Sequence, residues 1–114
     1  MIFDTHTHYD DEAFDSDREE LITGLPRKGV GTVVTVGADM ATSRAALELA
    51  GRYENVYAAI GVHPSETHGM TEQDLTWLRA HAANQKVVAV GEIGLDYHWK
   101  DTEPPVQRQW FEKQ

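Results

Sequence analysis

Four short apolar runs recur along the chain, at residues 2–5, 32–36, 56–60 and 87–90, and a glycine directly follows each of the last three. The runs are almost continuously apolar rather than alternating, which is typical of parallel strands covered on both faces. Segments with a helical spacing of apolar residues separate them. This alternation predicts a parallel sheet built from right-handed βαβ units, with strand ends at Gly37, Gly61 and Gly91.

Capping and spacing signals predict four helices. Ser16 and Glu19 form a capping-box pattern at the start of the first helix, and the second is expected at about residues 42–53. The third begins near Thr71, which has Asp74 three residues later. The last begins at residues 104–105, where two prolines suit a first helical turn. We expect these helices to bury Leu75, Leu78, Ala82, Trp77 and Trp110.

Two architectures use this alternation, a doubly wound sheet and a (β/α)₈ barrel. A dinucleotide-binding sheet carries a glycine-rich turn after its first strand, where this chain has His6-Thr7-His8-Tyr9-Asp10. A barrel needs eight units in about 250 residues, and this chain of 114 residues supplies about four. We therefore expect residues 1–114 to be a single domain, the first half of a TIM (β/α)₈ barrel. Its two open, apolar edges would allow self-association.

Composition restricts the available chemistry. The chain has no cysteine, so any metal must be held by His, Asp, Glu or water. Its 10 basic and 19 acidic residues give a net charge of −9. Binding along long duplex DNA needs an excess of Lys and Arg to neutralise phosphates, so the charge argues against that mode but not against action at a strand end. The start of the chain lacks a signal-peptide pattern, and no apolar run approaches the roughly 20 residues that span a bilayer. We expect a cytoplasmic protein that does not engage membranes.

Polar motifs follow three of the predicted strands. His6 and His8 alternate along the first, so both side chains point to one face, where two imidazoles can share a metal ion or simply form a hydrogen-bonded pair. Glu92 follows Gly91 and can bridge two cations, although an acidic residue at a strand end is also commonly just solvated. Because the carboxyl ends of parallel strands meet at one edge, these motifs are expected to converge there.

Two further residues are candidates at the same edge. His63 precedes Pro64 and can contact substrate or act as a general acid, or it can serve as a capping histidine. Asp96 can orient a ligand or a histidine, or cap a turn. Trp99 lies close by and can stack on a base or anchor the loop. The remaining histidines have no supporting pattern and are expected at the surface: His68, His81 and His98.

In order and spacing these motifs resemble the TatD family of metal-dependent deoxyribonucleases, through Asp4-Thr5-His6-Thr7-His8, Gly61-Val62-His63-Pro64 and Gly91-Glu92-Ile93-Gly94-Leu95-Asp96-Tyr97. Gln107, Phe111 and Gln114 are similar to the start of that family's next helix. The resemblance implies an amidohydrolase-type barrel that hydrolyses phosphodiester bonds with divalent metals. By motif position it implies that His6 and His8 hold the first metal and that Glu92 bridges two. It places His63 near the substrate phosphate, and the family's later histidines and aspartate beyond this chain.

The leading hypothesis is a deoxyribonuclease that acts on single-stranded DNA or strand ends, with two divalent ions (Zn, Mn, Mg or Co) per complete site. Glu92 and His63 are its expected catalytic residues, and His63 and Asp96 its expected substrate-binding residues. A second hypothesis keeps the metals but hydrolyses an ester or amide, such as an aminoacyl ester. A third is an inactive half that only binds metal or self-associates.

Overall fold

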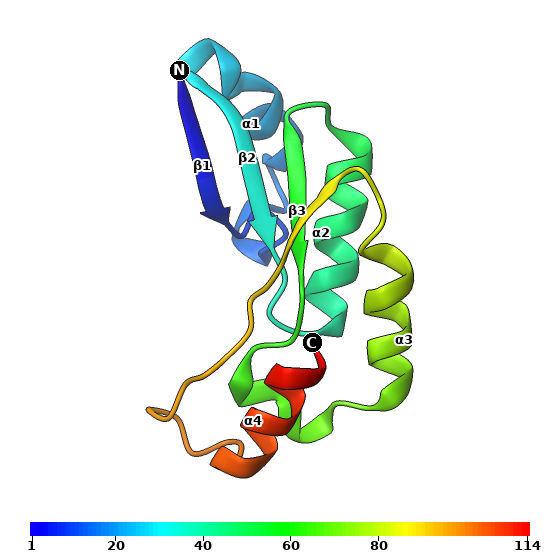
Figure 1. Cartoon of the computed structure of the whole chain (residues 1–114). Helices are drawn as coiled ribbons and strands as arrows, with labels where there is room; N and C mark the ends of the chain where they lie inside the picture. The colour runs from blue at the N-terminus through cyan, green and yellow to red at the C-terminus, as the bar shows by residue number, and fades with distance from the viewer.

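The computed structural model describes residues 1–114 and contains one four-stranded sheet in which every pairing is parallel. The strands lie side by side in chain order, and helices alternate with them as predicted (Figure 1). The strands are β1 (Ile2–Thr7), β2 (Val30–Val36), β3 (Val56–Ile60) and β4 (Val87–Val90). The α-helices are α1 (Arg18–Gly24), α2 (Met40–Arg52), α3 (Glu72–His81) and α4 (Pro104–Lys113). Three short 3₁₀ turns complete the chain, η1 (Glu12–Phe14), η2 (Pro26–Lys28) and η3 (Pro64–Gly69).

The main hydrophobic core lies between one face of the sheet and helices α1, α2 and α3. Alternate residues of β2 and β3 point into it, and they meet apolar side chains of the three helices. The core members are Ile22, Leu25, Val33, Ala46, Leu49, Ala50, Val56, Ala58, Ile60, Val62, Met70, Leu75 and Leu78. A small second cluster of Val34, Val36 and Ala59 lies on the opposite face. The sheet is thus covered by helices on one face only.

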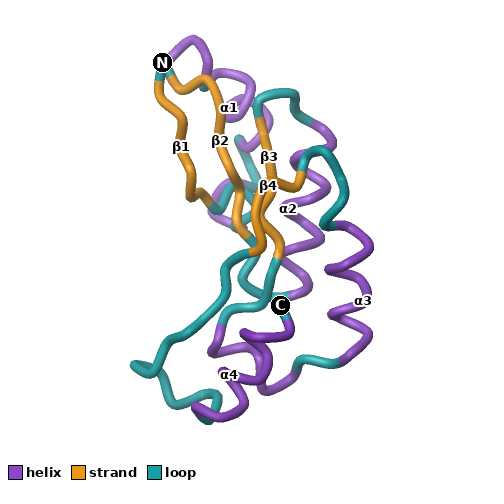
Figure 2. Tube along the Cα trace, in the orientation of Figure 1, coloured by secondary structure: helices purple, strands orange, loops and turns teal.

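Helix α4 occupies a different place from the other helices. It packs against η3 at the carboxyl end of the sheet, and a long loop descends to it from β4 (Figure 2). This end of the sheet is also where β1, β2 and β3 finish (Figure 1). The polar motifs predicted at strand ends therefore share their surroundings with α4.

The start of α1 differs from the prediction. The helix begins at Arg18 after Asp17, which makes no side-chain cap bond, so the expected capping box of Ser16 and Glu19 is wrong. The reason is that the Arg18 guanidinium donates hydrogen bonds back to the carbonyls of residues 9, 10 and 11 and to the Asp15 carboxylate. These bonds fold the preceding segment into a separate turn, and the helix begins only after it.

The other helices start close to the expected places. In α3, Thr71 and Asp74 form the predicted capping box. Helix α2 begins two residues before the expected position because Asp39 caps it by accepting a bond from the Thr42 amide. Ala82 is exposed and not buried as predicted, because α3 has already ended there.

The tryptophans and the strand edges complete this comparison. Trp77 and Trp110 are only half-buried and pack against the border of the core. Strands β1 and β4 form the two open edges of the sheet, and both carry exposed apolar side chains, as expected for this sheet: Ile2, Phe3, Val88 and Val90. No helix of the chain combines the length and the apolar character that crossing a membrane requires.

Two isoleucines provide a matched test of this core. Ile22 is 0% exposed in the core, whereas Ile2 is 60% exposed on β1. We expect Ile22→Ala to lower the free energy of unfolding by about 2–5 kcal/mol, because it leaves a cavity. Ile2→Ala should lower it by less than about 1 kcal/mol. Urea unfolding followed by circular dichroism measures both, and equal losses would place the core elsewhere.

Candidate functional site

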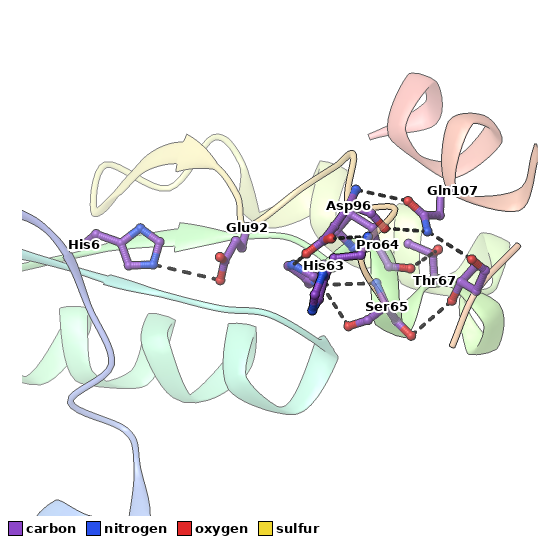
Figure 3. Close-up of polar contacts among 10 residues, drawn as sticks. His6, His63, Pro64, Ser65, Thr67, Glu92, Asp96 and Gln107 are labelled. Atoms are coloured by element: carbon purple, nitrogen blue, oxygen red, sulfur yellow. Dashed lines mark hydrogen bonds and ion pairs between the residues drawn. The ribbon is translucent and has the colours of Figure 1, made fainter. Parts of the chain in front are cut away.

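The ring nitrogens of His6, in β1, and His8, directly after it, come together. Their Nε2 atoms lie 3.2 Å apart, and the His6 Nε2 is 3.9 Å from a carboxylate oxygen of Glu92 (Figure 3). One ligand atom from each of the three residues lies within 4.8 Å of the others. Two imidazole nitrogens on one tetrahedral Zn²⁺, at about 2.1 Å each, lie roughly 3.4 Å apart. The observed group therefore has the donor types and the spacing that a divalent cation requires.

The orientation of His8 fits this donor set. Its Nδ1 lies 3.0 Å from the carbonyl oxygen of Val36, the last residue of β2. Because a carbonyl can only accept, the proton of neutral His8 is on Nδ1. The Nε2 lone pair is then free and faces His6. A backbone carbonyl that fixes the tautomer in this way is a common outer partner of metal-binding histidines.

Glu92 reaches this group although β4 is three places from β1 in the sheet. The chain leaves β4 across the end of β3, where the Gly91 amide donates to the carbonyl of Ile60. The Glu92 amide then donates to the carbonyl of Gly37, directly after β2, at 2.6 Å. The carboxylate thereby passes two strand ends and reaches His6 and His8 at the end of β1. The structure thus brings His6, His8 and Glu92 together at one edge of the sheet.

Close packing at the strand ends makes this crossing feasible. A Cβ on Gly37 would lie 2.3 Å from the Ser43 hydroxyl oxygen, and a Cβ on Gly61 would lie 2.9 Å from the Gly91 backbone. Ser43 is fully buried in α2, and its hydroxyl donates to the Gly61 carbonyl and accepts from the Gly61 amide. The two glycines therefore allow α2 and the segment after β4 to approach the strand ends without a clash.

His63 and Asp96 form a second pair at the same end of the sheet. The His63 Nε2 is 3.5 Å from an Asp96 carboxylate oxygen, and both side chains are mostly buried (Figure 3). The Nδ1 of His63 accepts a bond from the backbone amide of Ser65 at 3.1 Å, which caps η3. Since an amide can only donate, neutral His63 carries its proton on Nε2, directed toward Asp96. Both functions considered for His63, capping and facing the site, are therefore combined in one ring.

The Ser65 hydroxyl also lies 2.8 Å from the His63 Nδ1, so Ser65, His63 and Asp96 superficially form a hydrolase triad. In such a triad the histidine nitrogen beside the serine must be free to take its proton. Here that nitrogen already accepts the Ser65 amide hydrogen. The arrangement is thus a helix cap with an oriented Nε2–H group, and Ser65 has no free base beside it.

Asp4 lies next to the metal group but outside it. An irregularity in the pairing of β1 with β2 falls between Asp4 and Thr7, and the Asp4 carboxylate turns back to accept from the His6 amide. It also faces Tyr9: burial raises the pKa of the Tyr9 phenol, and the charge of Asp4 raises it further. Asp4 therefore supports the backbone that presents His6.

The sequence alone did not single out every residue of this region. His98 is exposed, as predicted, and His81 is half-buried against Trp77. His68 is exposed but is not isolated, because its Nδ1 contacts the carbonyl of Ser65 and the hydroxyl of Thr102. Ser65 was missed, and so was the structural use of Gln107 and Gln114. The only available signal was the seven-residue spacing of the two glutamines on one helix.

Metal binding by this group can be tested directly. We expect His6→Ala to weaken Zn²⁺ or Mn²⁺ binding by at least about 100-fold, because loss of an outer partner alone costs about 10–100-fold. His81→Ala, which removes a histidine of α3, should leave the affinity unchanged. Isothermal titration calorimetry with native mass spectrometry gives affinity and stoichiometry. Equal weakening in both variants would mean that no site exists at these three residues.

Comparison with known proteins agrees with this geometry. The family model described as TatD related DNase matches residues 3–114. A Bacillus subtilis protein named as an uncharacterized metal-dependent hydrolase, YabD, is 44% identical over all 114 residues, which cover 45% of its length. A Cronobacter sakazakii protein named 3′-5′ ssDNA/RNA exonuclease TatD is 33% identical over 99% of this chain and 43% of its own.

A solved structure gives the same answer for the fold. The crystal structure of YjjV, a TatD homologue from Escherichia coli K12, superimposes with a TM-score of 0.86 at 32% identity. The match covers 98% of this chain and 44% of that one, so the chain spans less than half the length of the relatives it matches. The expected fold class is confirmed, because the four βα units match part of a TatD-type barrel. The chain belongs to the TatD-related DNase family of metal-dependent hydrolases.

Proposed function

We propose that this chain contributes the first metal half-site of a divalent-metal-dependent nuclease that cleaves phosphodiester bonds in single-stranded DNA or at strand ends. The observation that carries the proposal is the group of His6, His8 and Glu92, with ligand atoms within 4.8 Å of one another. The exonuclease name of the Cronobacter relative supports the choice of nucleic acid as substrate.

His6 and His8 would hold one cation through their Nε2 atoms. The Glu92 carboxylate has a second oxygen available, which suits it to bridge to another cation. Divalent ions at such a site activate water and stabilise charge on phosphoryl oxygens. The His and carboxylate donors accommodate Zn, Mn, Mg or Co to differing degrees.

His63 and Asp96 would serve the substrate. The Nε2–H of His63 is a hydrogen-bond donor of the kind that binds a phosphate oxygen, which would replace the Asp96 carboxylate, 3.5 Å away, as its acceptor. Tyr97 and Trp99 are about half exposed in the loop after Asp96. Exposed aromatic rings of this kind are stacking partners for unpaired bases. The net charge of −9 favours a substrate that enters by its end over one gripped along its length.

Activity is best tested in a chimera, because the chain spans less than half the length of its relatives. In it, these 114 residues replace the matching segment of the Bacillus subtilis protein. We expect Mn²⁺-dependent cleavage of end-labelled single-stranded DNA. Glu92→Gln should lower the rate at least about 100-fold, because it removes charge from the metal group. Glu112→Gln removes the same charge at an exposed position of α4 and should leave the rate unchanged.

Two outcomes would contradict the proposal. Cleavage by Glu92→Gln at the unmutated rate would mean that this metal group does not take part. Hydrolysis of an aminoacyl ester in parallel assays, with no cleavage of DNA, would keep the metal site and replace the substrate.

A further inference from the structure

Two glutamines, Gln107 within α4 and Gln114 at its C-cap, turn their side chains toward the main chain of the site loops. They are seven residues apart, which places them two turns apart on the same helix face. Gln107 is only 2% exposed, which is unusual for an uncharged amide without a structural task. Gln109 lies between them on the exposed side of the same helix.

Gln107 holds the loop that contains Asp96. Its Oε1 accepts from the Asp96 amide at 3.1 Å, and its Nε2 donates to the Asp96 carbonyl at 2.9 Å and to the Thr102 carbonyl at 3.0 Å (Figure 3). One side chain thus joins the two ends of the segment 96–102. The backbone of Asp96 is bound on both of its polar groups.

Gln114 makes the equivalent contact with the other loop. Its Oε1 accepts from the Val62 amide at 2.8 Å, and its Nε2 donates to the Val62 carbonyl at 3.2 Å. Val62 directly precedes His63. A primary amide that pairs with both polar groups of one residue reproduces the pairing of a neighbouring strand. The backbone next to His63 is therefore fixed to the same helix that fixes Asp96.

A further link joins the two loops directly. The Thr102 hydroxyl donates to the carbonyl of Ser65, and the His68 Nδ1 contacts both of these groups. Thr102 is buried, with 4% of its surface exposed. This link fixes the far ends of the loops, but it touches neither His63 nor Asp96. The His63 amide donates to the Ala38 carbonyl at 2.7 Å, and the two glutamines bind the main chain of Val62 beside His63 and of Asp96 itself.

We propose that Gln107 and Gln114 are positioning residues that set the placement of His63 against Asp96 by fixing both loops to α4. This inference deepens the proposed function, since it concerns the pair assigned there to the substrate. Apolar packing could stabilise α4 equally well without amides. Hydrogen bonds, unlike apolar contacts, depend on direction. Each amide binds one N–H and one carbonyl of the main chain, so the loop can lie against the helix in only one position along its axis.

The test follows the His63 ring in the 114-residue chain labelled with ¹⁵N-histidine. We expect Gln107→Met and Gln114→Met to shift the Nε2 resonance of His63 in the direction produced by Asp96→Asn, which weakens the pair itself. Gln109→Met, on the exposed side, should leave the resonance unchanged. Hydrogen exchange at the Asp96 and Val62 amides should become about tenfold faster in the respective variants, as expected for loss of a hydrogen bond.

A double-mutant cycle separates positioning from general stabilisation. If Gln107 acts through Asp96, adding Gln107→Met to Asp96→Asn should cause no further shift at His63. Gln107→Glu gives a second variant in case Gln107→Met fails to fold, since it keeps the acceptor for the Asp96 amide and loses the donor to the two carbonyls. The inference would be overturned if the His63 resonance were unchanged in folded glutamine variants. It would also be overturned if the shift in the double variant equalled the sum of the shifts from Gln107→Met and Asp96→Asn.

This readout does not depend on catalysis. A shifted His63 resonance together with an inactive chimera would retain the positioning role and reject the proposed function. An unchanged resonance together with an active chimera would retain the proposed function and reject the positioning role. In an active chimera, the glutamine variants should lower kcat/KM for DNA, and Gln109→Met should not.

Discussion

The candidate metal group depends on two neighbouring backbone carbonyls at the end of β2. The Val36 carbonyl accepts from His8, and the Gly37 carbonyl accepts from the Glu92 amide. One bond fixes which nitrogen of His8 is free, and the other draws Glu92 across the sheet. A parallel sheet supplies such carbonyls because its strands end together at one edge. The central strand thereby orients residues that come from both edge strands.

This dependence explains why the strand ends are so closely packed. Glu92 can reach the end of β2 only if nothing projects from the strand ends between them, and Gly61 meets that requirement. Gly37 lets Ser43 of α2 approach, and Ser43 in turn binds both polar groups of Gly61. The core between the sheet and α2 and the polar site beyond it are consequently joined through one buried hydroxyl.

Much of this arrangement was predictable from the sequence. Apolar runs separated by helical segments imply parallel strands, and parallel strands bring His6, His8 and Glu92 to one edge even though 84 residues separate His8 from Glu92 in the numbering. What was not predictable depends on where irregular segments pass in space. The start of α1 is decided by Arg18 binding three carbonyls seven to nine residues before it, and Asp4 is turned aside by an irregularity in β1. Neither leaves a local pattern.

The two halves of the site are held by different means, and this affects how each tolerates change. His6, His8 and Glu92 are placed by strands and main-chain bonds, which do not depend on the identity of neighbouring side chains. His63 and Asp96 lie on loops, where the side-chain amides of Gln107 and Gln114 add to one main-chain bond from the His63 amide to the Ala38 carbonyl. Substitutions in α4 can therefore alter the His63–Asp96 pair while the candidate metal group stays intact. The loops can then be repositioned without rebuilding the sheet, which leaves the strand-end carbonyls that hold His8 and Glu92 in place.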